Sequence, residues 1–347
     1  MTARLQTLGA RLKAPLLVTN LTNVRYLTGF ESSNAALLVR PGGETTLYTD
    51  FRYLETARTV QGVTVEQTKR AVMEDLGERL TGRVQFEADV LPYLEFERLA
   101  AGKARLVPTS GIVAELRAVK EADEVASLRR AARIADRALE ALTAETWVGR
   151  TERELAWRLH ELVHAHGGDE LSFESIVASG ANGALPHARP TDALVEKGTL
   201  VTIDWGVRVD GYCSDCTRTF STGGHLPAEL RRAYEVCLDA QKHAVANVKA
   251  GLTGVEADAL ARERIAAAGF GEAFGHGLGH GVGLDVHEAP RLSTESPDTL
   301  ADGHCVTIEP GIYLPGVGGV RIEDLAVVRP DGVELLTAFP KELIEVG

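Results

Sequence analysis

The pattern of apolar and polar positions divides the chain into two parts. In the first part, short apolar runs typical of strands alternate with segments of helical spacing. The strand candidates are residues 16–18, 35–39, 45–48, 84–86 and 105–107. The helix candidates are residues 51–58 and 72–80. Pro41, Gly42 and Gly43 separate two of the strand candidates and predict a hairpin turn. This alternation predicts a mixed sheet covered by helices.

A long helix is predicted to open the second part. Residues 121–142 contain no Gly or Pro and are rich in Ala, Leu, Arg and Glu. We place the domain boundary near Val119, which gives domains 1–118 and 119–347. Further helices are expected at about 227–249 and 254–268, between strand segments and before a glycine-rich strand region. The predicted fold class is therefore α+β, with an α/β domain at the N-terminus.

Composition and charge exclude several classes of protein. The 347 residues, 44% hydrophobic and 25% charged, suit a globular protein of two domains. Apolar runs stay shorter than the roughly 20 residues that cross a bilayer, and the first residues lack a signal-peptide pattern. The formal net charge of −12 disfavours nucleic acid and anionic membranes as partners. We expect a cytoplasmic protein.

The four cysteines do not indicate a metal or redox site. Cys213 and Cys216 form a C-x-x-C, but Cys237 and Cys305 stand alone, so the second pair of a zinc site is missing. A redox pair would need a helix after its first cysteine, and the segment around Cys213 has the pattern of a strand. Cys213 and Cys216 are expected to be two reduced, structural cysteines.

Residues 160–164 read H-E-x-x-H, which on a helix can bind zinc beside a glutamate base. At about 100° per residue, the apolar positions of this helix share one face, and His160 and His164 point away from it. A catalytic zinc should face a cleft. The motif is therefore predicted to lie on a solvated helix face and not to form the active site.

Two aspartates follow or precede strand-like runs in the second domain. Asp204 ends the apolar run 200–203, and Asp215 comes after a turn at Val209-Asp210-Gly211. Either one alone would be an ordinary strand end or turn cap. A hairpin lays such strands side by side, so the two carboxylates are expected to converge.

Three histidines occur within twelve residues further along. His276, His280 and His287 lie in a stretch so rich in glycine that no helix is expected. A phosphate-binding loop is the main alternative, but neither G-x-G-x-x-G nor G-x-x-x-x-G-K-[ST] occurs there. The bare glycines let other segments approach and leave the imidazoles to project into a cleft.

Two glutamates complete a candidate metal site. Glu309 and Glu323 each lie at or near the end of an apolar run, where an unpaired carboxylate is costly to bury. Arg321 can neutralise only one carboxylate. Two Asp, two Glu and one His suit divalent metals such as manganese, cobalt or zinc. Two ions about 3.5–4 Å apart can share a water, lower its pKa and clamp a carbonyl oxygen.

These motifs resemble the pita-bread metallopeptidases, which include methionine aminopeptidase, aminopeptidase P and prolidase. The resemblance implies five metal ligands, in family order: Asp204, Asp215, His280, Glu309 and Glu323. It implies catalytic roles for His187, His287 and Glu309. It also implies substrate binding by His187, His276, Tyr313 and Arg321.

The first domain carries a second resemblance. Residues 23–30 and 48–53 are similar to the N-terminal domain of prolidases and creatinases, which methionine aminopeptidases lack. Together the resemblances imply hydrolysis of Xaa-Pro bonds in short peptides, chiefly dipeptides, by a hydroxide that bridges two divalent ions. An Xaa-Pro bond has no N–H, and a two-metal site needs none. Manganese is the expected metal, with cobalt or zinc as alternatives.

Other readings stay open on the sequence. The same site fits an Xaa-Pro aminopeptidase that acts on longer peptides. A metal-free creatinase-type C–N hydrolase and a non-catalytic binding relative fit less well, because such relatives lack the complete ligand set. The resemblance also implies a homodimer. The first domain is expected to limit substrates to two residues, with Arg25 and Arg52 as candidates to hold the terminal carboxylate.

Overall fold

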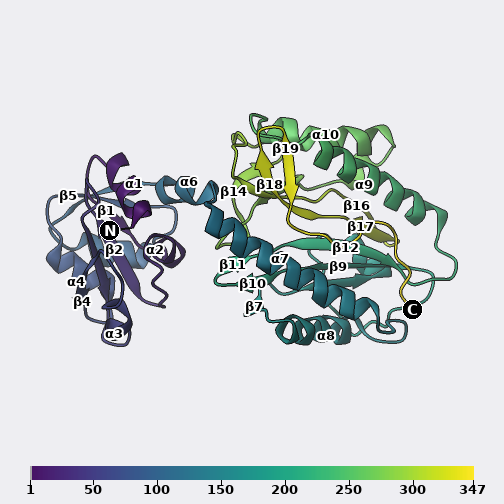
Figure 1. Cartoon of the computed structure of the whole chain (residues 1–347), viewed down its shortest axis with the longest axis horizontal. Helices are drawn as coiled ribbons and strands as arrows, with labels where there is room; N and C mark the ends of the chain where they lie inside the picture. The colour runs from purple at the N-terminus through teal and green to yellow at the C-terminus, as the bar shows by residue number, and fades with distance from the viewer. Residues whose placement is uncertain (1) are drawn as a thin grey trace. The chain divides into compact units, whose positions relative to one another are not determined.

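The computed structural model describes residues 2–347, which form two compact units, residues 2–117 and Ala118–Gly347 (Figure 1). Each unit has its own sheets, helices and hydrophobic core. The α+β class predicted from the pattern is confirmed. Within residues 2–347, no helix combines the length and apolar character needed to cross a bilayer.

The first unit is a six-stranded mixed sheet with helices packed on it. The strand order is β4-β3-β2-β1-β5-β6. The strands are β1 (Leu16–Val18), β2 (Ala35–Val39), β3 (Thr45–Thr49), β4 (Thr64–Gln67), β5 (Arg83–Glu87) and β6 (Arg105–Thr109). The helices are α1 (Ala3–Arg11), α2 (Leu21–Thr28), α3 (Leu54–Ala57), α4 (Val72–Arg79), α5 (Tyr93–Ala100) and α6 (Ile112–Ala118). The antiparallel pairing of β2 with β3 confirms the predicted hairpin.

The helix expected at residues 51–58 is shorter than predicted. Only Leu54–Ala57 is helical. Asp50 Oδ1 accepts hydrogen bonds from the backbone N–H and the Nε of Arg52, at 3.0 and 2.9 Å. A side chain that bonds the backbone two residues on holds a turn and competes with helix formation. The start of the segment is therefore a turn.

In the second unit, two helix pairs cover two different cores (Figure 1). Helices α7 (Ala122–Thr143) and α8 (Glu152–Ala165) share one core with β8 (Ile176–Ser179), β9 (Leu200–Trp205) and β12 (Cys216–Ser221). Helices α9 (Ala228–Asn247) and α10 (Gly254–Ala267) share the other with strands near the C-terminus. The predicted long helices are confirmed.

The strands of the second unit form four small sheets. A three-stranded sheet has the order β12-β9-β8, and a five-stranded sheet has the order β14-β13-β15-β18-β19. The remaining strands are β7 (Glu170–Leu171), β10 (Val207–Val209), β11 (Tyr212–Cys213), β13 (Gly279–Gly281), β14 (Glu288–Leu292), β15 (Cys305–Ile308), β16 (Gly311–Leu314), β17 (Gly318–Arg321), β18 (Asp324–Arg329) and β19 (Gly332–Leu335). Short 3-10 turns cover Gly180–Ala184 and Gly271–Ala273.

Local sequence explains where two of these helices begin. Thr151 caps α8 by accepting from the backbone N–H of Glu154, whose carboxylate accepts from the N–H of Thr151 in return. Thr253 and Glu256 form the same reciprocal pair at the start of α10. Such capping boxes satisfy backbone donors that the first turn of a helix leaves unpaired.

The glycine-rich segment lets the sheets approach closely. A Cβ on Gly279 would lie 2.1 Å from the carbonyl oxygen of Thr307, so only glycine fits beside β15. The neighbouring residue, His280, is the central residue of β13. As predicted, no helix forms over residues 275–288 of the described chain.

All four cysteines, Cys213 and Cys216 among them, are free and buried. Burial raises the pKa of the Cys216 thiol well above its usual range. A buried thiol with a raised pKa is a poor nucleophile and a poor metal ligand.

Candidate metal centre

The five sequence-predicted ligands meet at one cavity of the second unit. The cavity has a volume of about 1110 Å³ and is lined by 26 residues in total. Among them are all five predicted ligands, namely Asp204, Asp215, His280, Glu309 and Glu323. The predicted residues His187, His276, His287 and Arg321 line the same cavity.

Strand pairing brings the acidic residues together. Asp204 lies in β9 opposite Thr217 of β12, and Asp215 immediately precedes β12. Glu309 directly follows β15, and Glu323 lies between β17 and β18. Because β15 pairs with β18, both glutamates lie at the same end of that pair. Each carboxylate thus stands on or beside a strand, where the backbone holds it rigidly.

His280 lies at the centre of the acidic set. Its Nε2 is 3.2 Å from Glu309 Oε1 and 3.7 Å from Asp215 Oδ2. Ligand atoms of Asp215, His280 and Glu323 all lie within 4.8 Å of one another. The Nδ1 of His280 lies 3.1 Å from the carbonyl oxygen of Gly281, which can only accept, so Nδ1 carries a hydrogen.

This assignment leaves the Nε2 lone pair of a neutral His280 facing a carboxylate oxygen. Two acceptors at 3.2 Å repel each other unless a cation lies between or beside them. When no metal is bound, a proton on Nε2 removes this repulsion. Burial alone would lower the pKa of His280, but Glu309 outweighs burial and raises it. A divalent ion satisfies the same atoms and the other carboxylates as well.

Three further contacts orient the carboxylates. Thr217 Oγ1 donates to Glu323 Oε2 at 2.7 Å, and Thr307 Oγ1 donates to Glu309 Oε1 at 2.9 Å. The guanidinium of Arg321 donates to Asp204 Oδ2 at 2.6 Å. The other oxygen of Asp204, Oδ1, is buried and has no hydrogen-bond partner among the described residues. An unpaired buried carboxylate oxygen fits a metal ligand.

The electrostatics of the set also favour a cation. Burial raises the pKa of Asp215 and of Glu323 well above the usual range, and neighbouring carboxylates raise both further. Burial also raises the pKa of Asp204, although Arg321 opposes the shift. Burial would raise the pKa of Glu309, but its bond with His280 outweighs this and lowers it to about 2. The positive charge that the described residues supply is therefore too small to balance four ionised carboxylates, and a bound cation would balance them.

Arg321 links this set to the aromatic residues behind it. The buried guanidinium donates to Tyr313 Oη at 2.8 Å, to Thr217 Oγ1 at 3.1 Å and to the carbonyl of Pro186 at 3.0 Å. With the bond to Asp204, the Arg321 side chain makes four hydrogen bonds to other residues of the protein. The sequence-based expectation that Arg321 neutralises a single carboxylate agrees with this geometry.

His276 is the last member of a chain of hydrogen bonds that runs from Arg321 through Tyr313. Its Nδ1 lies 2.8 Å from the carbonyl oxygen of Gly277, and its Nε2 lies 2.9 Å from Tyr313 Oη. The Gly277 carbonyl can only accept, so Nδ1 donates and Tyr313 donates to Nε2. Burial lowers the pKa of His276 and raises the pKa of Tyr313 to about 12. Both ring nitrogens of His276 are engaged within the protein.

His187 and His287 differ from His276 in being exposed within the cavity. The ring centroid of His287 lies 4.3 Å from that of His280. Partial burial lowers the pKa of His287, and the nearby His280 lowers it further. A neutral His287 keeps one N–H to donate, beside the metal-ligand set and open to substrate.

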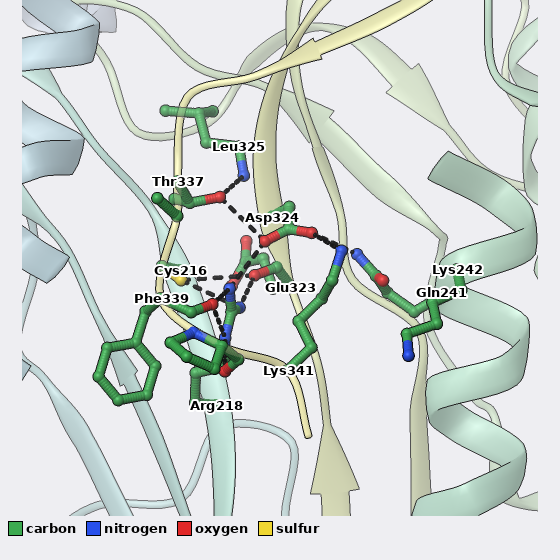
Figure 2. Close-up of polar contacts among 12 residues, drawn as sticks. Cys216, Arg218, Gln241, Lys242, Glu323, Asp324, Leu325, Thr337, Phe339 and Lys341 are labelled. Carbon is green, nitrogen blue, oxygen red and sulfur yellow. Dashed lines mark hydrogen bonds and ion pairs between the residues drawn. The ribbon is translucent and has the colours of Figure 1, made fainter. Parts of the chain in front are cut away.

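A buried ion network behind Glu323 was not predicted from the sequence (Figure 2). Asp324 accepts from Arg218 at 2.8 Å, from Gln241 at 2.8 Å and from Lys341 at 2.5 Å. Arg218 also donates to the backbone carbonyl of Glu323. The network joins β12, α9, β18 and the C-terminal segment, and it fixes the backbone that carries Glu323. Its contacts from Arg218 and Gln241 to Asp324 join residues more than 80 positions apart, so the local sequence pattern does not reveal them.

The H-E-x-x-H motif lies where the helical pattern placed it. Leu155, Leu159 and Val163 are fully buried on the inner face of α8. His160 and His164 are on the outer face, and neither lines the cavity of the metal-ligand set. As predicted, the motif lies apart from the cavity that the five candidate ligands line.

The two arginines suggested as carboxylate clamps are engaged within the first unit. Arg52 makes two charged hydrogen bonds to Asp50, at 2.9 and 2.7 Å. Arg25 pairs with Glu31 at 2.8 Å. In the second unit, Arg189 and Arg291 are exposed cations in the cavity lining. They were not singled out from the sequence, because nothing local marks them.

Two family models and many known proteins match this chain. Residues 126–330 match metallopeptidase family M24, and residues 4–119 match the creatinase/prolidase N-terminal domain. An Xaa-Pro dipeptidase from Pyrococcus horikoshii is 37% identical over 333 residues, which cover 95% of this chain and 94% of the relative.

Two solved structures extend the comparison. An Xaa-Pro dipeptidase from Bacillus anthracis superposes with a TM-score of 0.94 at 39% identity, covering 99% of this chain and 98% of that one. An X-Pro aminopeptidase from Thermotoga maritima superposes with a TM-score of 0.85 at 33% identity, covering 96% and 97%. With its family match, its full-length relatives and its acidic cavity, the chain belongs to metallopeptidase family M24 and carries the N-terminal domain of creatinases and prolidases.

Proposed function

We propose that this protein hydrolyses the Xaa-Pro bond of short peptides, and of dipeptides above all, with two divalent metal ions. The observation that carries the proposal is the convergence of four carboxylates and one imidazole in a single cavity with one paired arginine. Relatives that cover nearly the whole chain and are named Xaa-Pro dipeptidase support the substrate class.

The two ions would be held by Asp204, Asp215, His280, Glu309 and Glu323. Manganese or cobalt suits a set dominated by carboxylates, and zinc is the alternative. Two such ions supply an activated water and an electrophile for the scissile carbonyl. The residues fit this role because Asp204 Oδ1 has no partner in the described chain and His280 Nε2 faces carboxylate oxygens.

The protein's own groups would then orient and stabilise the reacting atoms. Thr217, Thr307 and Arg321 each hold one carboxylate oxygen of the set in place. His287, which is neutral near pH 7 because its pKa is lowered, can donate a hydrogen bond to the oxyanion that develops on the carbonyl. Glu309 stays ionised because its bond with His280 lowers its pKa to about 2, which suits a metal ligand. A carboxylate with so low a pKa is a weak base, so the catalytic role that the resemblance implies for Glu309 stays a prediction.

The substrate would bind on the exposed side of this set. His187 and His287 are exposed in the cavity lining, so both can reach a bound peptide. Pro186, Pro190 and Ile176 add apolar lining suited to a proline ring, which makes no N–H contact. His276, with both nitrogens engaged, is assigned to holding Tyr313 and to presenting its ring to the substrate.

Selectivity between dipeptides and longer peptides depends on the far end of the substrate. A cation that binds the terminal carboxylate favours dipeptides, and Arg291 or Arg189 is the candidate in the second unit. An open channel would give an Xaa-Pro aminopeptidase, the activity named for the Thermotoga maritima structure. The homodimer, the cytoplasmic location and the length limit set by the first domain stay predictions.

The test is hydrolysis of a Gly-Pro-type dipeptide beside a tripeptide with the same first two residues. We expect turnover of the dipeptide, loss of nearly all activity in Asp215→Ala, His280→Ala and Glu323→Ala, and full activity in His160→Ala and His164→Ala. Equal turnover of both peptides would make aminopeptidase the better description. Activity that depends on His160 and His164 would contradict the site itself.

A further inference from the structure

We propose that His160, His164 and Glu170 form a separate divalent-metal site on the outer face of α8, one that binds nickel, copper or zinc in preference to manganese. The three residues offer ligand atoms that all lie within 4.8 Å of one another. None of them lines the cavity of the metal-ligand set described above. The site is thus independent of the proposed peptidase activity.

The two imidazoles already stand at the spacing that a shared ion needs. His160 and His164 are four residues apart on a helix, so their side chains lie on the same face. Their Nε2 atoms are 3.1 Å apart. With metal–nitrogen distances of about 2.0–2.1 Å, two tetrahedral ligands are roughly 3.3 Å apart. Little movement is therefore needed to place one ion between both rings.

His164 is held in the tautomer that binds metal. Its Nδ1 lies 3.2 Å from the carbonyl oxygen of Gly168, which can only accept, so Nδ1 carries the hydrogen and Nε2 the lone pair. Gly168 is fixed against the core, since a Cβ there would lie 2.7 Å from Val207 Cγ1 and 2.8 Å from Val163 Cγ1. A backbone carbonyl that orients the second nitrogen is the usual support for a metal-binding histidine.

His160 is oriented from its other side. Its ring stacks on Trp157, with centroids 5.3 Å apart and planes at 16°. Trp157 is held by its own N–H, which donates to Glu161 Oε1 at 3.1 Å. The other oxygen of Glu161 accepts from Arg158 at 3.0 Å. Glu161 is therefore committed elsewhere and does not act as a base beside the two histidines, so the site binds an ion without hydrolysing peptides.

Glu170 supplies the third ligand from a different element. It lies in β7, where it pairs with Arg208 of β10, and its side chain is exposed. An exposed glutamate can change its rotamer at small cost, which brings its carboxylate within reach of the ion. A helix and a strand that are both anchored in the core thus hold the three ligands.

The ligand types set the ion preference. Two imidazoles and one carboxylate suit nickel, copper and zinc, which bind nitrogen more strongly than manganese does. The buried set with four carboxylates favours manganese or cobalt by the same reasoning. The two sites can therefore be distinguished by the choice of ion. The alternative is a plain hydrogen bond between the two imidazoles, with no affinity for metal beyond that of scattered surface histidines.

The test uses untagged protein saturated with manganese and passed over immobilised nickel. A resin-bound ion reaches surface side chains only, so the buried set does not contribute. We expect retention of the wild type, loss of retention in His160→Ala and His164→Ala, and unchanged retention in the controls His243→Ala, on α9, and His225→Ala. Peptidase activity should be equal in all five proteins.

A calorimetric titration with nickel, in excess manganese, gives the solution result. We expect the wild type to bind one nickel ion more per chain than His164→Ala, and we expect weaker binding at this site in Glu170→Gln. No retention of the wild type, or equal nickel binding in His164→Ala, would overturn the proposal. Equal affinity in Glu170→Gln would overturn the three-ligand site. Failure of the peptidase assays would leave these outcomes unaffected.

Discussion

Arg321 and Asp204 form a buried ion pair in which only one carboxylate oxygen is used. The Arg321 guanidinium lies 2.6 Å from Asp204 Oδ2, and Asp204 Oδ1 is left without a partner among the described residues. Arg321 is itself fixed by Thr217, Tyr313 and Pro186. The pair therefore leaves one oxygen of Asp204, a residue that lines the cavity, free for a metal ion while it neutralises part of the acidic charge.

Replacing Arg321 with Lys should weaken both metal binding and catalysis. An ammonium group cannot reproduce the fork that holds Asp204, Thr217 and Tyr313 together. Outer partners of this kind typically contribute about 10–100-fold to metal affinity or activity. Manganese affinity and kcat should both fall by roughly that factor, as measured by metal titration and steady-state kinetics. The control is Arg329→Lys, at an exposed ion pair on β18, which should leave both unchanged. Wild-type affinity in Arg321→Lys would contradict the positioning role.

His287→Ala should impair the reaction and not the metal content. His287 lines the cavity beside His280 but is not one of the five proposed ligands. Removing one donor to a developing oxyanion costs about 10²–10³ in rate. We expect kcat for a Gly-Pro-type dipeptide to fall by about that factor, with two ions still bound per chain. A loss of one ion in this variant would make His287 a ligand instead.

Local pattern was enough to predict much of the fold. The helix at Ala122–Thr143, the hairpin of β2 and β3 and the outward face of α8 all follow from apolar spacing. The helix expected from residue 51 was wrong at its start, because Asp50 bonds the Arg52 backbone and makes a turn. That competition between a side chain and the helix is invisible to spacing alone.

The sequence likewise identified the residues of the candidate site but not the contacts that orient them. The acidic residues at strand ends could be named from sequence because burying a lone carboxylate there is costly. The contacts that orient them join residues far apart in sequence, as in Thr217 with Glu323 and Asp324 with Arg218. Such pairs depend on strand register, which a single sequence does not specify. The carboxylate clamps suggested in the first domain illustrate this, since Arg25 and Arg52 pair with local carboxylates.

Arg291 is the cation we expect to recognise a free terminal carboxylate. It is exposed in the cavity lining, and its charge reaches far enough to lower the pKa of His287. Arg291→Ala should raise KM for an Xaa-Pro dipeptide at least several-fold and leave KM for the corresponding dipeptide amide unchanged. Arg329→Ala, at an exposed ion pair on β18, is the control and should change neither. If Arg189→Ala gives this pattern and Arg291→Ala does not, Arg189 is the residue that binds the carboxylate.

His304 should make the stability of the protein depend on pH. Burial and, to a smaller extent, the nearby Lys120 lower the pKa of His304 to about 4. Its Nδ1 accepts from the Ala301 N–H at 3.1 Å, which protonation would break. The unfolded state binds the proton first, so this contribution is complete above about pH 6.5 and is lost as the pH falls toward 4.

The expected loss from this group is about 3 kcal/mol between those two pH values, measured by denaturant unfolding. In His304→Asn, whose Oδ1 can accept from Ala301 without titrating, the slope over this range should be smaller. An unchanged slope would show that His304 is not responsible. The measurement needs metal-saturating conditions at each pH, because metal binding also stabilises the folded state.

The most direct test of the central claim is a titration of metal-free protein with manganese, followed by the rate of hydrolysis of a Gly-Pro-type dipeptide. Manganese is chosen because the His160 and His164 site should not compete for it. The two-metal account predicts negligible turnover without metal, a rise that ends at two ions per chain, and no recovery in Asp215→Ala at the same concentrations. Full turnover by the metal-free protein, or recovery that is complete without any bound ion at the five-residue set, would contradict it.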